Sequence, residues 1–228
     1  MNGLKKAGRL ALDLLFPPRC PLCDAVLGFC PVCENCRSQE PVLLRVPGQA
    51  VEAKGHALTF VTAAYAPYWY EGVVRQAVWR IKSDEREDAA KAMAARMAAC
   101  LRAAGVAPGL VLPVPSSKLE LRRRGYSPPA LLARALAAEL ALPCREDVLE
   151  KPFETRHQRG LGPAERRANL LGAFRVARRE EVQHRRVLLV DDVLTTGATL
   201  NECAKMLLAA GAQDVSAVCA AVTRTEEG

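Results

Sequence analysis

One short segment, residues 187–200 (VLLVDDVLTTGATL), constrains the fold of this chain more than any other. Four branched aliphatic residues in a row are typical of a strand buried inside a parallel sheet. Asp191 and Asp192 follow at once, and a loop rich in threonine then leads into a helix expected over 199–212. The segment therefore predicts a strand, a ligand-facing loop and a helix in direct succession.

The rest of the chain supplies further strands and helices in alternation, the pattern of an α/β protein. We expect an α/β fold with a mostly parallel, doubly wound sheet. The expected strands cover 58–66, 110–115, 185–193 and 215–223. The expected helices cover 1–16, 70–82 with a break near Ser83 and Asp84, 86–104, 127–142 and 199–212. Residues 38–58 read as a connector or short strands, and 151–170 as a long basic loop, which in a compact domain is usually functional.

The loop after the acidic pair has the chemistry of a phosphate site. A helix N-terminus presents backbone N–H groups without partners, and these attract an anion. Gly197 lets the backbone approach such a ligand closely. The carboxylates of Asp191 and Asp192 suit the two ribose hydroxyls, which are hydrogen-bond donors. The segment therefore predicts a ribose 5-phosphate site that comprises Asp191, Asp192, Thr195, Thr196, Gly197, Ala198 and Thr199.

The sequence DDVLTTGAT closely resembles the signature of type I phosphoribosyltransferases, which bind phosphoribosyl pyrophosphate (PRPP). The resemblance implies that Mg-PRPP binds, that pyrophosphate leaves from the ribose C1, and that a nitrogen nucleophile attacks. Asp191 and Asp192, as the catalytic pair, would hold the ribose, and 195–199 the 5-phosphate. Catalysis would come mainly from positioning and charge stabilisation.

Three more segments, 70–82, 112–128 and 155–174, together with an N-terminal cysteine cluster, resemble the ComF family of phosphoribosyltransferase-like proteins. The resemblance places Pro115 and Ser116 in a pyrophosphate loop. It also implies PRPP contacts from Arg122, Arg124 and Arg166, and we prefer this interpretation to the alternative that these arginines are simply solvated. Ser127 stands where the family usually has asparagine. Lys82 could reach a pyrophosphate oxygen or simply end a helix at the surface.

Five cysteines lie within 20–36, and they include two Cys-x2-Cys turns. Four thiolates in a tetrahedron select zinc, and a closed set of four indicates a structural ion. Cys30 leaves the choice open, since Cys30 and Cys33 also form such a turn. The resemblance to the family favours Cys20, Cys23, Cys33 and Cys36. The alternative is a set of reduced, metal-free thiols. We expect residues 1–45 to form a short helix plus this zinc module, and 46–228 the phosphoribosyltransferase-like domain.

Composition bounds the remaining possibilities. The chain has 32 basic and 25 acidic residues, a net charge of +7, which fits a polyanionic ligand or a basic surface kept for solubility. Because no apolar run approaches the roughly 20 residues of a membrane span, we expect a cytoplasmic protein without membrane insertion. The aromatic run 68–70, near Arg75 and Arg80, could stack single-stranded bases or belong to the core.

Two functions follow from the resemblance. The first is a ComF-type protein with a PRPP site that takes part in natural competence, handling single-stranded DNA during uptake with a competence helicase as a possible partner. The second is an active phosphoribosyltransferase that transfers the phosphoribosyl group from Mg-PRPP to a nitrogen acceptor and releases pyrophosphate. An intact ribose-phosphate signature supports both, and no segment spells out a pocket for an acceptor base.

Overall fold

A computed structural model describes residues 17–27, 30–52, 55–152 and 172–224. Its centre is a sheet in which every pair of neighbouring strands is parallel. The strand order is β1-β7-β6-β3, and β2 continues along β7 beyond β1. The strands are β1 (Ala64–Tyr65), β2 (Tyr68–Trp69), β3 (Leu110–Pro113), β6 (Arg186–Leu194) and β7 (Asp214–Val222). The expected parallel α/β sheet is confirmed.

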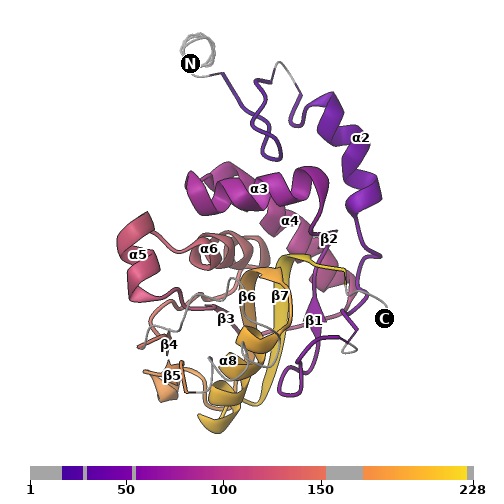
Figure 1. The fold of residues 1–228 in the computed structure, drawn as a ribbon. Helices are drawn as coiled ribbons and strands as arrows, with labels where there is room; N and C mark the ends of the chain where they lie inside the picture. Colours follow the sequence, from indigo (N-terminus) through magenta and orange to yellow (C-terminus); the bar gives the residue numbers. More distant parts are fainter. Residues whose placement is uncertain (1–16, 28–29, 53–54, 153–171, 225–228) are drawn as a thin grey trace, which may run out of the picture.

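Both faces of this sheet are covered, which explains the unbroken apolar runs of its strands. Successive residues of β6 point to opposite faces. Leu188 and Val190 therefore join one core, with α3, α4 and α6, while Val187 and Leu189 join another, with α8. Figure 1 shows α3 and α6 on the side of the sheet away from α8. These helices are α3 (Gly72–Ser83), α4 (Glu87–Ala103), α6 (Pro128–Leu140) and α8 (Ala198–Ala209).

Two expected strands differ from the structure. Of 58–66, only Ala64–Tyr65 is a strand, because Phe60 N–H bonds the Asn201 side chain (2.8 Å) and the chain turns there. Pro67 then interrupts the extended stretch, since it has no N–H for a ladder. By contrast, β6 does not end at the two acids. It continues to Leu194, which pairs with Val222 of β7.

Two helices lie in segments for which no helix was expected. Residues Lys118–Arg124 form α5, whose first turn is closed by a capping box: Ser117 accepts from Glu120 N–H and the Glu120 carboxylate accepts from Ser117 N–H. Residues Glu34–Leu43 form α2 although Pro41 lies inside it. Near α8, β4 (Leu149–Glu150) and β5 (Arg175–Val176) make a small antiparallel pair, and a single 3₁₀ turn covers Arg179–Glu181.

The cysteine segment lies against α3 and shares a core with it, as the indigo trace in Figure 1 indicates. Arg80 of α3 donates to the Leu22 carbonyl oxygen (3.2 Å), and Arg86 pairs with Asp24. The boundary between residues 45 and 46 stays a prediction. The expected helix over 1–16 and nearly all of the loop 151–170 lie outside the described residues. Every described helix is too short or too polar to cross a bilayer.

Candidate ribose-phosphate site and cysteine cluster

The acidic pair lies at the carboxyl end of β6, in the middle of the sheet. Because neighbouring residues on a strand face opposite ways, Asp192 points to the side of α3 and Asp191 to the side of α8. Asp191 Oδ1 also accepts a hydrogen bond from the N–H of Asp192 (2.8 Å). The two carboxylates therefore flank the same strand end, where ligands bind in open parallel sheets.

Lys82, in the last turn of α3, forms an ion pair with Asp192. Its Nζ lies 2.8 Å from Asp192 Oδ1, and the side chains are 31% and 12% exposed. Burial favours the neutral amine, but the charges of Asp192 and Asp191 outweigh it and raise the pKa of Lys82 above its ordinary value. Lys82 is thus a charged, half-buried member of the site rather than a surface lysine.

Asp191 has a different environment from Asp192. Burial first, and the charge of Asp192 second, raise the pKa of Asp191 to about 8, although the N–H of Asp192 and the ammonium of Lys82 act against this shift. Asp192 is therefore paired with Lys82, whereas Asp191, with its pKa of about 8, largely holds its proton at neutral pH. A ligand with several hydroxyls meets both an acceptor and a donor here.

The loop between β6 and α8 has the backbone expected of a phosphate cradle. Gly197 is the N-cap of α8, with φ +76°, and it has no side chain to occupy the helix N-terminus. A Cβ on Gly197 would lie 3.0 Å from Ala57 O, so a neighbouring segment already closes one side of the loop. Thr195 is exposed, and Thr196 and Thr199 are partly exposed.

The loop after β3 reaches the same edge of the sheet, because β3 is parallel to β6. Val114 N–H donates to Val190 O (2.9 Å), which sets Pro115 and Ser116 beside the end of β6. Both residues are partly exposed. The Ser116 and Ser127 hydroxyls are hydrogen-bonded (2.9 Å), and Ser127 also caps α6. The residue that departs from the family pattern therefore has a structural role here.

Helix α5 carries Arg122 and Arg124, which together with Gly125 and Tyr126 form an Arg-x-Arg-Gly-aromatic element. Arg122 is exposed and Arg124 is partly exposed, and neither forms an ion pair with another described residue. Glu120 of the same helix was not expected in the site. Although burial opposes ionisation, the Ser117 N–H, Lys151 and Arg124 lower its pKa. The Ser-x-x-Glu spacing of a capping box was the available sequence signal. Arg166 lies outside the described residues.

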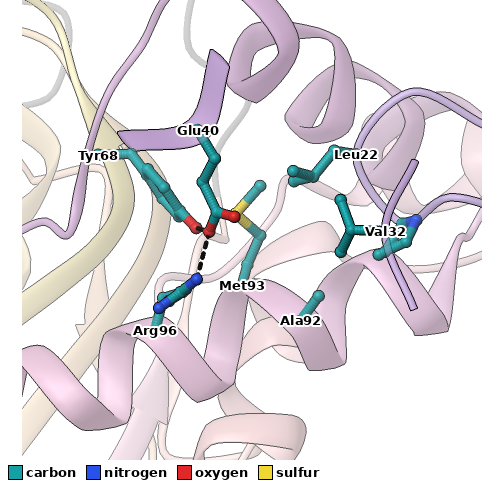
Figure 2. A pocket seen from close by; sticks show the side chains of 8 residues that line it. Leu22, Val32, Glu40, Tyr68, Ala92, Met93 and Arg96 are labelled. Atoms are coloured by element: carbon teal, nitrogen blue, oxygen red, sulfur yellow. Dashed lines mark hydrogen bonds and ion pairs between the residues drawn. The ribbon is translucent and has the colours of Figure 1, made fainter. Parts of the chain in front are cut away.

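The aromatic run 68–70 belongs to the core rather than to a base-stacking surface. Tyr68 is buried, and its hydroxyl donates to Glu40, which also pairs with Arg96 (2.7 Å). Figure 2 shows these three side chains beside a cavity of about 100 Å³ under the cysteine segment. The ring of Trp69 packs against the second core, and the guanidinium groups of Arg45 (5.1 Å) and Arg224 (4.5 Å) both lie over it.

The structure brings four cysteines together. The sulfur atoms of Cys20, Cys23, Cys33 and Cys36 all lie within 4.8 Å of one another. Tetrahedral zinc with Zn–S bonds of about 2.3 Å requires sulfur separations of about 3.8 Å, close to this arrangement. Cys36 N–H also donates to Cys33 Sγ (3.5 Å), as expected of a thiolate ligand. This cluster could hold a metal ion such as zinc. Cys30 is exposed and is not a member of the cluster.

Comparison with known proteins agrees with the geometry. The family model of the phosphoribosyl transferase domain matches residues 124–227. Competence protein F of Haemophilus influenzae is 40% identical over 109 residues, which are 47% of this chain and 48% of that protein. DNA utilization protein YhgH of Escherichia coli K12 is 28% identical over 228 residues, covering 90% of this chain and 97% of that protein.

For competence protein F and three YhgH proteins, the matched part of the chain spans about half of the relative, 48% of its length. Among solved structures, adenine phosphoribosyltransferase from Leishmania tarentolae has a TM-score of 0.37 at 21% identity, over 63% of this chain and 59% of that one. We draw no conclusion about the fold from a likeness with so low a TM-score. The chain is therefore a homologue of competence protein F and of YhgH, and its residues 124–227 match the phosphoribosyl transferase domain.

Proposed function

We propose that the site at the end of β6 binds Mg-PRPP. One observation carries this proposal: Asp191 and Asp192 lie in the last four residues of β6, and only Val193 and Leu194 separate them from the 195–199 loop at the N-terminus of α8. The carboxyl groups would hold the ribose hydroxyls. The loop would hold the 5-phosphate through Thr195, Thr196, Gly197, Ala198 and Thr199, whose amides lie at the positive end of the helix.

The pyrophosphate would lie over the loop after β3. Pro115 and Ser116 lie at the same sheet edge, and Arg122 and Arg124 lie on α5, the helix that follows this loop. Arg166 is proposed to join them from the segment outside the described residues. Magnesium, which prefers phosphate and carboxylate oxygens, would enter with the ligand and neutralise part of its charge. The residues of the chain bind and orient PRPP, and the guanidinium groups stabilise negative charge on the pyrophosphate.

We further propose that the chain is a cytoplasmic ComF-type protein that handles single-stranded DNA in natural competence. The printed names of its relatives, competence protein F and DNA utilization protein, support this role. The net charge of +7 favours a polyanionic partner. The proposed zinc module, residues 1–45, would be a docking element for DNA or a helicase, and 46–228 would carry the PRPP site.

A second candidate is catalytic turnover, in which the phosphoribosyl group passes to a nitrogen acceptor and pyrophosphate is released. The match of residues 124–227 to the phosphoribosyl transferase domain favours it. Asp191 and Asp192 would hold the ribose while positive charge develops at C1, and the pyrophosphate would leave toward the basic side chains of α5.

The experiment is calorimetric titration of the zinc-loaded chain with Mg-PRPP, beside the Asp191→Asn/Asp192→Asn double variant. Asparagine keeps the volume and a polar contact for Lys82, so the variant should fold, and its far-UV circular dichroism checks this. Micromolar binding of Mg-PRPP by the wild type and no binding by the double variant would support the site. No binding by the folded wild type refutes it. Release of pyrophosphate with candidate acceptors then separates turnover from binding alone.

The DNA role has its own test. Binding of a fluorescent single-stranded oligonucleotide is measured between about 50 and 200 mM salt, with and without Mg-PRPP. A steep fall in affinity as salt rises indicates phosphate contacts, since each releases about one counterion. Absence of DNA binding at low salt, in a protein that still binds PRPP, would remove the DNA role and leave the PRPP site standing.

A further inference from the structure

The ion pair between Lys82 and Asp192 creates a conflict inside the proposed site. Asp192 is one of the two acceptors proposed for the ribose hydroxyls, yet in the free protein its Oδ1 is already paired with Lys82 Nζ at 2.8 Å. Both side chains are mostly buried, so neither can be separated from its partner and left unpaired without a large desolvation cost. A ligand whose hydroxyl displaces Lys82 from Asp192 Oδ1 must therefore supply a new partner for the ammonium group.

The charges near Lys82 limit what that partner can be. The acidic side chains that raise the pKa of Lys82 are Asp192 and Asp191. Once a ribose hydroxyl bonds Asp192, the ammonium needs an anion from the ligand. A ribose ring with a pyrophosphate on C1 carries hydroxyls and anionic oxygens side by side, so it satisfies both members of the pair. Ribose 5-phosphate has its anion at the other end of the sugar.

The backbone that carries Lys82 is held in place, so the exchange would be a side-chain movement. Tyr126 donates to Ile81 O (2.9 Å), and Arg80 donates to Leu22 O (3.2 Å), on either side of the last turn of α3. The flexible four-carbon stem of lysine allows its ammonium to change partners while Cα stays fixed. The loop after β3, where the pyrophosphate is proposed to lie, borders the same end of β6.

We propose that Lys82 is the residue that makes this site selective for a pyrophosphorylated ribose. In the free protein its ammonium pairs with Asp192. On binding, the ribose hydroxyls take Asp192 and the ammonium transfers to the pyrophosphate. The inference rests on the proposed PRPP site and adds to it an exchange of partners and a basis for discrimination among sugar phosphates.

The test compares three ligands on the same preparations: Mg-PRPP, magnesium pyrophosphate and ribose 5-phosphate, titrated by calorimetry. The proteins are the wild type, Lys82→Met, Lys82→Arg and the control Lys91→Met. Lys91 is an exposed α4 lysine paired with Glu87, so its loss should change no affinity. Lys82→Met should weaken Mg-PRPP and pyrophosphate binding by on the order of 10- to 100-fold, the range expected for a lost charge-assisted hydrogen bond. Its affinity for ribose 5-phosphate should stay the same or rise.

The ratio of two affinities within one variant does not depend on the folded fraction, so partial misfolding of Lys82→Met would not obscure the result. Lys82→Arg keeps the charge and should keep most of the preference for PRPP. An equal loss for PRPP and ribose 5-phosphate in Lys82→Met would show that Lys82 only positions Asp192, and would overturn the proposal. Unchanged affinities in that variant would overturn it too. A wild type that binds none of the ligands defeats the PRPP site itself.

Discussion

The hydroxyl of Tyr126 donates a hydrogen bond to the carbonyl oxygen of Ile81 at 2.9 Å and accepts one from the N–H of Glu85 at 2.9 Å. This single side chain joins the turn after α5 to the end of α3. Lys82, which pairs with Asp192, lies between the two backbone groups that Tyr126 binds. The Arg-x-Arg-Gly-aromatic element is thereby connected to the ribose-phosphate site through hydrogen bonds rather than through the sheet.

Replacing Tyr126 by phenylalanine should therefore affect both stability and ligand binding. The ring keeps its packing, but two backbone groups lose their partner, which costs about 1–3 kcal/mol of unfolding free energy. Because the end of α3 is then less well held, the affinity for Mg-PRPP should fall several-fold. Urea unfolding and calorimetry measure the two effects. Tyr65→Phe is the control, because the Tyr65 hydroxyl has no hydrogen bond to the described residues. A Tyr126→Phe protein as stable as the wild type would contradict the assigned role.

Metal content distinguishes the four clustered cysteines from Cys30. Cys33→Ser removes one of four sulfur ligands and should abolish stoichiometric zinc in the purified protein, whereas Cys30→Ser should retain one zinc per chain. Elemental analysis gives both numbers. Removal of the metal with a chelator should also lower the unfolding temperature, since binding to the folded state is lost. Retention of full zinc by Cys33→Ser would show that Cys30 or another group is the ligand.

Two features of the structure require a glycine at position 197. One is its positive φ angle, and the other is the close approach of Ala57. An alanine here must adopt φ +76° and place its Cβ 3.0 Å from Ala57 O and from Leu58 Cδ2. The positive φ alone costs about 1–2 kcal/mol, and the contacts would displace the loop that is proposed to bind the 5-phosphate. Gly197→Ala should therefore lose at least 10-fold in Mg-PRPP affinity.

Gly105→Ala is the matched control for Gly197→Ala. Gly105 has φ +68°, but nothing lies within 4 Å of an added Cβ. In urea unfolding, Gly105→Ala should have a lower free energy of unfolding because of the positive φ angle. Its affinity for Mg-PRPP should not change. Equal effects of the two substitutions on PRPP binding would mean that the close approach of Ala57 plays no part.

The central strands could be predicted because the local sequence of each one determines its secondary structure. The aliphatic runs of β3, β6 and β7 are short and apolar, which is typical of strands in a sheet that is covered on both faces. Helices α4, α6 and α8 are predicted by their apolar periodicity and their capping residues. The acidic pair was predictable for the same reason, since it directly follows such a run. The four clustered cysteines were predictable from spacing together with the family resemblance.

Other features depend on contacts that are distant in sequence. The strand expected over 58–66 is shortened by Asn201, which lies more than a hundred residues later. Helix α2 contains Pro41, which disfavours a helix by propensity, but its Leu43 packs in the core shared with α3. The pairing of Lys82 with Asp192 joins a helix and a strand across the sheet, so no local pattern could distinguish it from a lysine at a helix end.

The raised pKa of Asp191 gives the free protein a characteristic dependence of stability on pH. The pKa is about 8 in the folded protein against an ordinary value of 3.8, so between these values the folded state retains a proton that the unfolded chain releases. Stability from this group is complete below pH 4 and is lost as pH rises through about 8. The slope for one full proton is about −1.4 kcal/mol per pH unit.

The charged or titratable groups around Asp191 are Asp192, Lys82, Glu120, Lys151, Cys203 and Cys219. The four of them with a shifted pKa, which are Lys82, Glu120, Cys203 and Cys219, titrate outside the window of pH 5 to 7. Glu120 has a lowered pKa, so its effect lies below its ordinary value of 4.5, and that of Lys82 lies above 10.5. The thiol pKa values of Cys203 and Cys219 are raised well above 9.0. Asp191 should therefore dominate the local contribution in this window.

Urea unfolding of the zinc-loaded protein at pH 5, 6 and 7 measures the slope, and Asp191→Asn should flatten it because asparagine does not titrate. Deprotonation of Asp191 should also be coupled to binding if the ribose hydroxyls need its charged form. In that case the affinity of the wild type for Mg-PRPP should rise as pH increases from 6 to 8, and the affinity of Asp191→Asn should rise much less. Identical unfolding slopes for the two proteins would show that Asp191 is ionised throughout, with its charge balanced by Lys82 alongside that of Asp192.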